Sequence, residues 1–250
     1  MALFSYIKIL ARINKYSHIR KYRSNSDMNS RIKDYKVKMG FGLHTGWAIE
    51  GAIGSHFKID ASYLSPNINL AARLEVATLQ YGVQMLISGE LIDVMNKDIK
   101  KMCREIDTVT VKGSVKPMRL FTIDLNESKI VEAHDRLIKL TNKDKKKILE
   151  REKFVVWQAL KNRSMSTLSL FKNDADFIDL RSDFSKEFQK LFAEGYTAYK
   201  KGNWEDAKTI FEKCIKERGD GPSKTLLEFM EETNFVAPSD WEGYRALTSK

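Results

Sequence analysis

The chain has 250 residues, of which 42% are hydrophobic and 30% are charged, and it carries a net charge of +10. This composition is typical of a soluble, folded globular protein and excludes a disordered chain. Its two cysteines, Cys103 and Cys214, form neither a metal motif nor a disulfide framework, which favours a reducing, cytoplasmic compartment. No apolar run reaches the roughly 18 residues that a membrane-spanning helix needs, so the sequence predicts no such helix.

The N-terminal region is basic. Residues 1–38 contain ten Lys and Arg against two Asp, and apolar residues recur at helical spacing, which predicts an amphipathic helix over residues 1–23. No nucleic-acid motif accompanies the basic residues, so we expect a solvated basic face and no nucleic-acid partner. Binding to an acidic partner or a membrane is the alternative interpretation.

A loop and a strand pair are predicted next. Residues 24–34 are rich in turn residues and predict a loop. Residues 36–43 alternate with period two and predict a strand, and Gly46 predicts the turn into a second strand over residues 47–53. Gly40 and Gly42 share a face of the first strand, where a large group can lie close to the backbone.

A well-marked helix follows. Ser65-Pro66 predicts its start and Gly82 its end, after about Gln80. A strand over residues 83–87, a short helix capped by Ser88, and a strand pair over 106–111 and 119–125 come next. This alternation predicts an α+β fold, a sheet with helices on one face.

The composition changes after residue 125. We predict a charged helix over 139–163, a loop or short extended piece over 164–183, a helix–turn–helix over 184–217 and a helix over 223–232. The sequence thus suggests three parts: residues 1–125, a charged linker over 126–183, and a helical tail over 184–250.

Asn69 and Arg73 are the candidate site residues, because residues four apart share a helix face. An amide beside a planar guanidinium suits a nucleotide phosphate, and Lys112 is a second candidate phosphate-binding cation. A surface ion pair is the alternative interpretation of a lone Arg. The sequence contains no dinucleotide fingerprint, no Gly-Lys-Ser/Thr phosphate loop and no nucleophile elbow.

Five blocks in order, GFGLHTGWAIEGAIGS, SPNINLAARLE, YGVQMLIS, IDTVTVKGSVKP and LFTIDL, resemble the catalytic domain of class III adenylate and guanylate cyclases. The resemblance covers about residues 36–125. It implies a ferredoxin-like sheet with helices and the conversion of ATP or GTP to a cyclic nucleotide and pyrophosphate. It also implies two Mg or Mn ions and a site shared with a second cyclase domain, in a homodimer or a heterodimer.

The same resemblance suggests residue roles. Asn69 would orient the ribose, Arg73 would stabilise the reacting phosphate, and Lys112 would bind the triphosphate. The purine-selecting position falls on Ser62, and Asp60 could replace it only if the turn shifts. The base preference therefore stays open.

The sequence departs from the family in one respect. The metal-binding aspartates belong to an Asp-x-x-Gly-Phe strand and a Gly-Asp turn, and this chain contains neither. We therefore expect an N-terminally incomplete cyclase domain, inactive alone, whose metal ligands come from another segment or chain. The alternative is a non-catalytic relative that acts as a regulatory or interaction partner. We expect a cytoplasmic location, and as part of a longer parent protein the chain could also lie at the cytoplasmic face of a membrane.

The tail has a likeness of its own. Residues Gly195, Gly202, Trp204, Ala207 and Phe211 fit one tetratricopeptide-type helix pair. One such repeat cannot bury its own apolar face, so it must pack on neighbouring helices or on a partner. Simple helical packing without a signalling role is the alternative interpretation.

Overall fold

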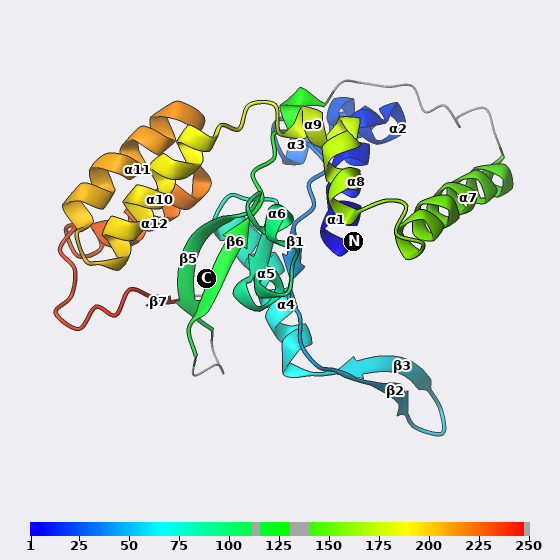
Figure 1. The fold of residues 1–250 in the computed structure, drawn as a ribbon, viewed down its shortest axis with the longest axis horizontal. Coiled ribbons are helices and arrows are strands. Elements are labelled where there is room, and N and C mark those ends of the chain that lie inside the picture. The colour runs from blue at the N-terminus through cyan, green and yellow to red at the C-terminus, as the bar shows by residue number, and fades with distance from the viewer. Residues whose placement is uncertain (112–115, 131–140, 248–250) are drawn as a thin grey trace. The chain divides into compact units, whose positions relative to one another are not determined.

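The computed structural model describes residues 1–111, 116–130 and 141–247, and it divides into two compact units (Figure 1). Unit 1 contains Met1–Met39 and Leu125–Asp183, and unit 2 contains Gly40–Asp124 and Phe184–Lys250. Each unit is therefore built from two separate stretches of the chain. The three-part division proposed from the sequence stays a prediction. The two units group the same residues in another way, since residues 1–125 contribute to both units.

Unit 1 is helical where it is described. Its elements are α1 (Ala2–Lys15), α2 (Ser17–Arg20), the 3-10 turn η1 (Lys21–Ser24), α3 (Ser26–Arg31), η2 (Glu127–Lys129), α7 (Asn142–Lys161), α8 (Thr167–Asn173) and α9 (Ala175–Leu180). The helix predicted over residues 1–23 is present only in part: α1 buries Leu3, Ile7 and Leu10, but it ends before the extended Tyr16, and the short α2 and η1 follow. The charged helix is present as α7.

Two predicted loops of unit 1 were wrong. Residues 24–34 contain α3, which Asn25 caps, and residues 164–183 contain α8 and α9, which Ser166 and Asp174 cap. Asn, Ser and Asp mark both turns and helix starts, because their side chains accept the unpaired first amides of a helix. Here they act as caps, which the turn-rich composition alone does not reveal.

An ion cluster joins α1 to α9 within unit 1. Lys8 donates to Asp174 at 2.8 Å and also to Asp176, and Lys15 donates to Asp176 at 2.7 Å. Burial alone would raise the pKa of Asp176, but the bonds from Lys15 and Lys8 outweigh it and lower that pKa. The charged forms of these side chains therefore hold the two helices together.

A mixed five-stranded sheet forms the centre of unit 2. Its strands are β1 (Phe41–Leu43), β4 (Met85–Ser88), β5 (Arg104–Thr110), β6 (Met118–Thr122) and β7 (Arg245–Ala246), and their order is β1-β4-β6-β5-β7. The pairs β1–β4 and β5–β7 are parallel, and β4–β6 and β5–β6 are antiparallel. The predicted α+β class and the predicted hairpin over residues 106–125 are confirmed.

The other predicted hairpin was wrong. Residues 36–43 contribute only the short β1, which pairs with β4, while β2 (Ile49–Gly54) pairs antiparallel with β3 (Ile59–Leu64). The turn closes where the Ser55 amide donates to the carbonyl of Lys58. A period-two pattern identifies a strand but not its partner, so the pairing was not determined by the pattern.

The helices of unit 2 lie where the sequence predicts them, with one addition. They are α4 (Pro66–Gln80), α5 (Gly89–Asp93), α6 (Lys97–Lys100), α10 (Lys186–Lys200), α11 (Trp204–Arg218) and α12 (Gly221–Glu231). The helix α6 was not predicted. Gly82 follows α4 with a φ of +60°, as a helix-terminating glycine does.

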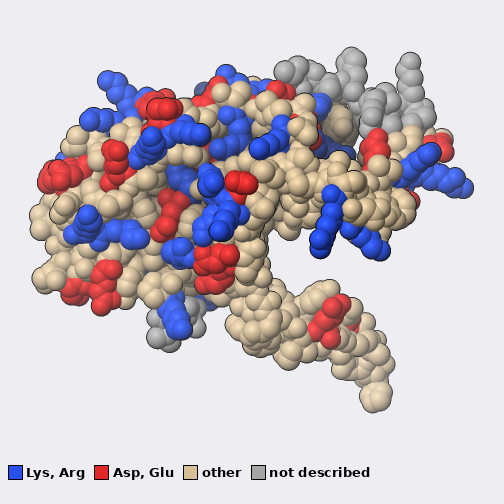
Figure 2. Space-filling view, in the orientation of Figure 1, with Lys and Arg blue, Asp and Glu red and all other residues tan. Residues whose placement is uncertain are grey.

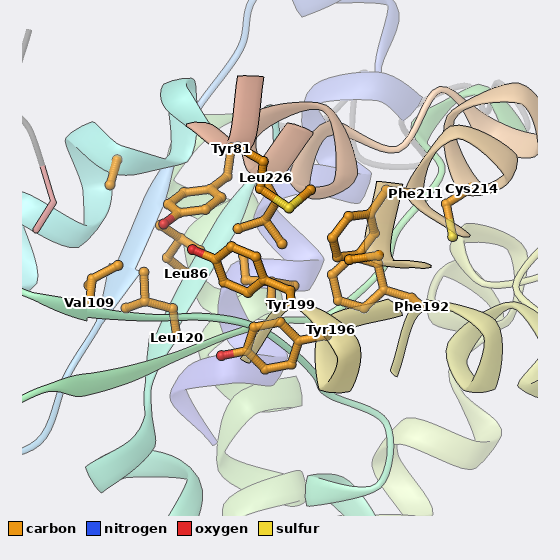
Figure 3. Packing of buried hydrophobic residues seen from close by; sticks show 14 of the residues in the cluster. Tyr81, Leu86, Val109, Leu120, Phe192, Tyr196, Tyr199, Phe211, Cys214 and Leu226 are labelled. Atoms are coloured by element: carbon orange, nitrogen blue, oxygen red, sulfur yellow. The ribbon is translucent and has the colours of Figure 1, made fainter. Parts of the chain in front are cut away.

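The tail and the sheet share one hydrophobic core (Figure 3). Leu86 and Leu120 of the sheet belong to the same buried cluster as Phe192, Tyr199 and Phe211 of the tail. The predicted helical tail is therefore an integral part of unit 2.

Two buried ion networks strengthen this attachment. Arg104 of β5 donates to Asp124 and to Asp220, each at 2.7 Å, and Arg245 of β7 donates to Asp107 of β5 at 2.8 Å. Tyr81 donates to the same Asp107 at 2.6 Å. Asp220 and Arg245 come from the tail, so both networks link it to the sheet.

In the part of the chain that the structure describes, no helix combines the length and apolar character that crossing a bilayer requires.

Candidate functional site

The helix α4 carries the candidate site, and its start is fixed by hydrogen bonds. The Ser65 hydroxyl accepts from the Asn67 amide at 3.0 Å and donates to the carbonyl of Trp47. The side-chain amide of Asn67 donates to that same carbonyl at 2.8 Å. The Ser-Pro signal in the sequence thus corresponds to a capped helix whose first turn is tied to the segment before β2.

The glycines of β1 make room for α4. A Cβ atom on Gly42 would lie 2.1 Å from the carbonyl oxygen of Ala71 and 2.5 Å from the amide nitrogen of Glu75. On Gly40 it would lie 2.5 Å from the Thr78 hydroxyl. The large group predicted to lie against this face is therefore α4 itself, which places the helix directly on the sheet.

Asn69 and Arg73 lie on the outward face of α4. Leu74 and Thr78 are buried on the other side of the helix, and Asn69 and Arg73 are exposed. The two side chains are four residues apart and so share one stripe of the helix surface. The structure therefore brings together the amide and the guanidinium that the sequence singled out.

The other predicted site residues, Ser62, Asp60 and Lys112, do not lie on α4. Ser62 lies opposite Gly51 in the β2–β3 hairpin, and the exposed Asp60 pairs with Lys58 at 3.0 Å. Residues two apart in a strand point to the same face, so Ser62 and Asp60 share a face of β3. Lys112 lies outside the described residues.

His44 is a supporting residue that sequence reasoning missed. One ring nitrogen lies 2.8 Å from the Ser88 hydroxyl and the other lies 3.1 Å from the Asn67 side-chain oxygen, and the side chain is only 5% exposed. His44 thus connects the end of β1 to the starts of α4 and α5. The four histidines have no ligand spacing in the sequence, so no local signal singles this one out.

The hairpin β2–β3 exposes an apolar surface, which we call the hairpin surface. Seven large apolar side chains in and beside the hairpin are between 53% and 100% exposed: Trp47, Ile49, Ile53, Phe57, Ile59, Tyr63 and Leu64. The hairpin carries few charged side chains on the face seen in Figure 2. Large exposed apolar side chains concentrated in one element are typical of a protein interaction site.

The described residues offer no ready set of metal ligands. Among them, no group of three or more His, Cys, Asp and Glu is arranged to hold a metal ion. The buried carboxylates Asp107, Asp124 and Asp220 are paired with arginines. The described residues therefore do not fit the two-metal centre that the resemblance implies.

Unit 2 has a cavity that lies away from the exposed face of α4. A cavity of about 370 Å³ is bounded by β5 and α10, with Glu105, Gln189 and Lys200 among its lining residues. None of Asp60, Ser62, Asn69 and Arg73 lines it. In the part of the chain that the structure describes, Asn69 and Arg73 therefore present an exposed helix face.

Curated relatives support the cyclase interpretation in part. The chain is 28% identical over 89 residues to an adenylate cyclase of Anabaena cylindrica and 30% identical over 94 residues to adenylate cyclase 1 of Rhizobium meliloti (strain 1021), covering 35% and 38% of this chain. It is 29% identical over 127 residues, 49% of this chain, to the terminal-differentiation specific adenylate cyclase of Dictyostelium discoideum.

These matches span only part of each relative. They cover 18%, 14% and 6% of the three relatives' own lengths, in the order given above. No protein-family model matches the chain. The similarities support a relationship between part of this chain and the catalytic domain of adenylate cyclases.

Proposed function

We propose that unit 2 supplies the nucleotide-binding side of a class III-type cyclase site, which converts ATP or GTP to a cyclic nucleotide and pyrophosphate. The observation that carries the proposal is the pair Asn69 and Arg73 on the exposed stripe of α4, together with the adenylate cyclase relatives. The capped first turn and the close contact with β1 hold this helix rigidly.

The chemistry assigned to these residues is positioning and charge stabilisation. Phosphoryl chemistry needs the nucleophile aligned with the phosphorus and the developing charge stabilised. In the proposal, Asn69 orients the ribose and Arg73 stabilises the reacting phosphate, while Ser62 and Asp60 are candidates for contacting the base. Mg or Mn ions, when bound, neutralise phosphate charge, and we assign their ligands to a second cyclase domain.

The hairpin surface is the proposed contact for that second domain. The seven large apolar side chains of the hairpin surface are exposed to solvent in this chain, and exposed apolar side chains of this kind favour contact with a partner. A second cyclase domain, either another copy of this chain or a different one, would bury it. The hairpin ends at Ser65, the cap of α4, so a domain docked there lies near the helix that carries Asn69 and Arg73.

Complementation tests the catalytic part of the proposal. The chain is mixed with a cyclase domain that carries the metal-binding aspartates and lacks its own transition-state arginine, and product formation from Mn-ATP and Mn-GTP is measured. We expect activity that falls about 100- to 1,000-fold with Arg73→Ala. Gln80→Ala is the matched control, because Gln80 lies seven residues along the same stripe of α4. Equal activity of all three chains would refute the assignment.

The partner surface has a separate test. Ile59→Lys together with Leu64→Lys places charges on the hairpin surface, and we expect sedimentation velocity to show loss of association with the second domain. Val94→Lys is the control, since Val94 is 72% exposed on unit 2 outside the hairpin. If the mixture associates and binds nucleotide but makes no product, the non-catalytic alternative gains support.

A further inference from the structure

The helix α7 of unit 1 has an unusual surface. A stripe with spacings of three and four residues runs along its whole length, and we call it the basic–aromatic stripe: Lys143, Lys146, Lys147, Glu150, Phe154, Trp157 and Lys161. All seven side chains are exposed. The half-buried apolar residues of the helix, among them Ile148, Val156 and Leu160, lie on another face.

The two aromatic rings belong to the charged face and not to the apolar one. Phe154 is 56% and Trp157 is 52% exposed, and their ring centroids lie 6.1 Å apart. The Lys161 ammonium lies 4.9 Å from the Trp157 ring centroid. Large rings exposed among lysines are unfavourable in water alone, because their apolar area stays hydrated.

Charge is distributed unevenly between the two units. By sequence, unit 1 contains 23 Lys and Arg and 12 Asp and Glu, a net charge of +11, whereas unit 2 contains 20 and 21, a net charge of −1. The positive charge of the protein therefore belongs entirely to unit 1. Basic side chains project along α7 in Figure 2.

We propose that α7 docks unit 1 on an anionic phospholipid membrane through the basic–aromatic stripe. At the membrane interface, Trp and Phe rings settle at the level of the headgroups, while lysines contact the anionic groups. Each juxtamembrane Lys adds favourable attraction that salt weakens. The helix lies along the surface and does not cross it, and the proposal does not depend on the cyclase chemistry.

Charge complementarity favours an anionic membrane over a second copy of the chain as the surface that contacts the stripe. The stripe has a net charge of +3, from four lysines and one glutamate, so two copies facing each other repel. An acidic peptide would match the lysines but offers no interfacial layer for two aromatic rings. A membrane containing anionic lipid matches both features at once.

Vesicle sedimentation of the full chain tests the proposal. We expect binding to phosphatidylcholine vesicles containing about one-third phosphatidylserine, at least about tenfold stronger than to phosphatidylcholine alone and reduced by salt. Lys143→Glu with Lys146→Glu and Lys147→Glu should lower binding at least about tenfold. Lys201→Glu with Lys213→Glu and Lys216→Glu is the control, because it changes the net charge equally on exposed positions of unit 2.

Fluorescence locates the contact. In a Trp47→Phe background, which removes the other strongly exposed tryptophan, brominated lipids should quench the emission, and Trp157→Phe should abolish that quenching. If the α7 variant and the unit 2 control variant lose vesicle binding equally, the proposal is overturned, because net charge alone would then explain the binding. Binding of polyglutamate through the stripe with no vesicle binding would also overturn it. Circular dichroism confirms that each variant remains folded.

Discussion

Gly42 shows how a single missing side chain positions the candidate site. Its backbone lies so close to α4 that a Cβ atom would meet the helix backbone, which cannot move as a flexible side chain does. The exposed stripe of α4 owes its position to this contact. Gly51, in the exposed strand β2, is the opposite case, because a Cβ atom added there would have nothing within 4 Å.

We therefore predict opposite outcomes for two chemically identical substitutions. Gly42→Ala should lower the free energy of unfolding by at least about 2 kcal/mol, because the added methyl group forces α4 away from the sheet. Gly51→Ala should leave it unchanged or slightly raised. Urea denaturation followed by fluorescence of the unit 2 tryptophans measures both. Similar stabilities for the two variants would mean that α4 does not rest on β1 as described.

Cys214 provides a second prediction at this scale. Burial, together with the nearby Asp220, raises the pKa of its thiol to about 11. Because the thiolate is the reactive form, its exchange with a disulfide reagent at pH 8 should be about 100-fold slower in the folded chain than in urea. A Cys103→Ser variant leaves Cys214 as the single thiol and allows the rate to be followed with a chromogenic disulfide. Equal folded and unfolded rates would show that α11 opens readily.

The individual elements differ in how far the sequence determined them. The helix α4 was predicted closely, because Ser65-Pro66 and Gly82 are local signals that act through nearby backbone atoms. The pairing of β2 with β3 could not be read from alternation, since alternation says nothing about the neighbouring strand. The short helices α8 and α9 were missed because their caps resemble turn residues.

The attachment of α1 to α9 yields a pH-dependent prediction. The pKa of Asp176 is lowered in the folded chain, since bonds from Lys15 and Lys8 outweigh the effect of burial. A carboxyl group with a depressed folded pKa stabilises the fold above its unfolded pKa of about 3.9, and that stabilisation is lost as the pH falls through the folded value.

Asp176→Asn should therefore speed hydrogen exchange in α1 at pH 7, and its effect should shrink as the pH falls below about 3.9 and through the lowered folded pKa. Exchange of the peptide that covers Ala2–Lys15 measures this directly, and corrected intrinsic rates allow different pH values to be compared. Asp179→Asn is the control, because Asp179 is a less buried neighbour in the same helix. An effect independent of pH would mean that the charge of Asp176 does not hold α1.

At the scale of the whole molecule, part of the site was accessible to sequence reasoning and part was not. Asn69 and Arg73 became candidates through a spacing that any helix converts into a shared face, together with the resemblance of the surrounding motif to cyclases. The support from His44 depends on contacts between residues 23 and 44 positions apart, which no local pattern encodes. The shared core of sheet and tail is likewise a long-range property, visible only once residues 184–247 pack on β5.

The network of Arg245, Asp107 and Tyr81 is the sharpest test of that shared core. Asp107 is completely buried, and burial raises its pKa although Arg245 and Tyr81 oppose the increase. Arg245→Met removes the compensating charge and should cost about 3–5 kcal/mol of stability at pH 7. The cost should grow as the pH rises above the unfolded pKa of about 3.9, because the unfolded carboxyl is then ionised while burial raises the pKa of the folded one.

The double variant Asp107→Asn with Arg245→Met distinguishes the destabilisation caused by an unpaired buried charge from the destabilisation caused by losing the Arg245 side-chain contact. The amide keeps an acceptor for the Tyr81 hydroxyl and has no charge to desolvate, so the double variant should be more stable than Arg245→Met alone and independent of pH over this range. Urea denaturation followed by the fluorescence of Trp204 and Trp241 reports on the tail directly. If Arg245→Met unfolds with wild-type stability, the network of Arg245, Asp107 and Tyr81 adds nothing to the attachment of the tail.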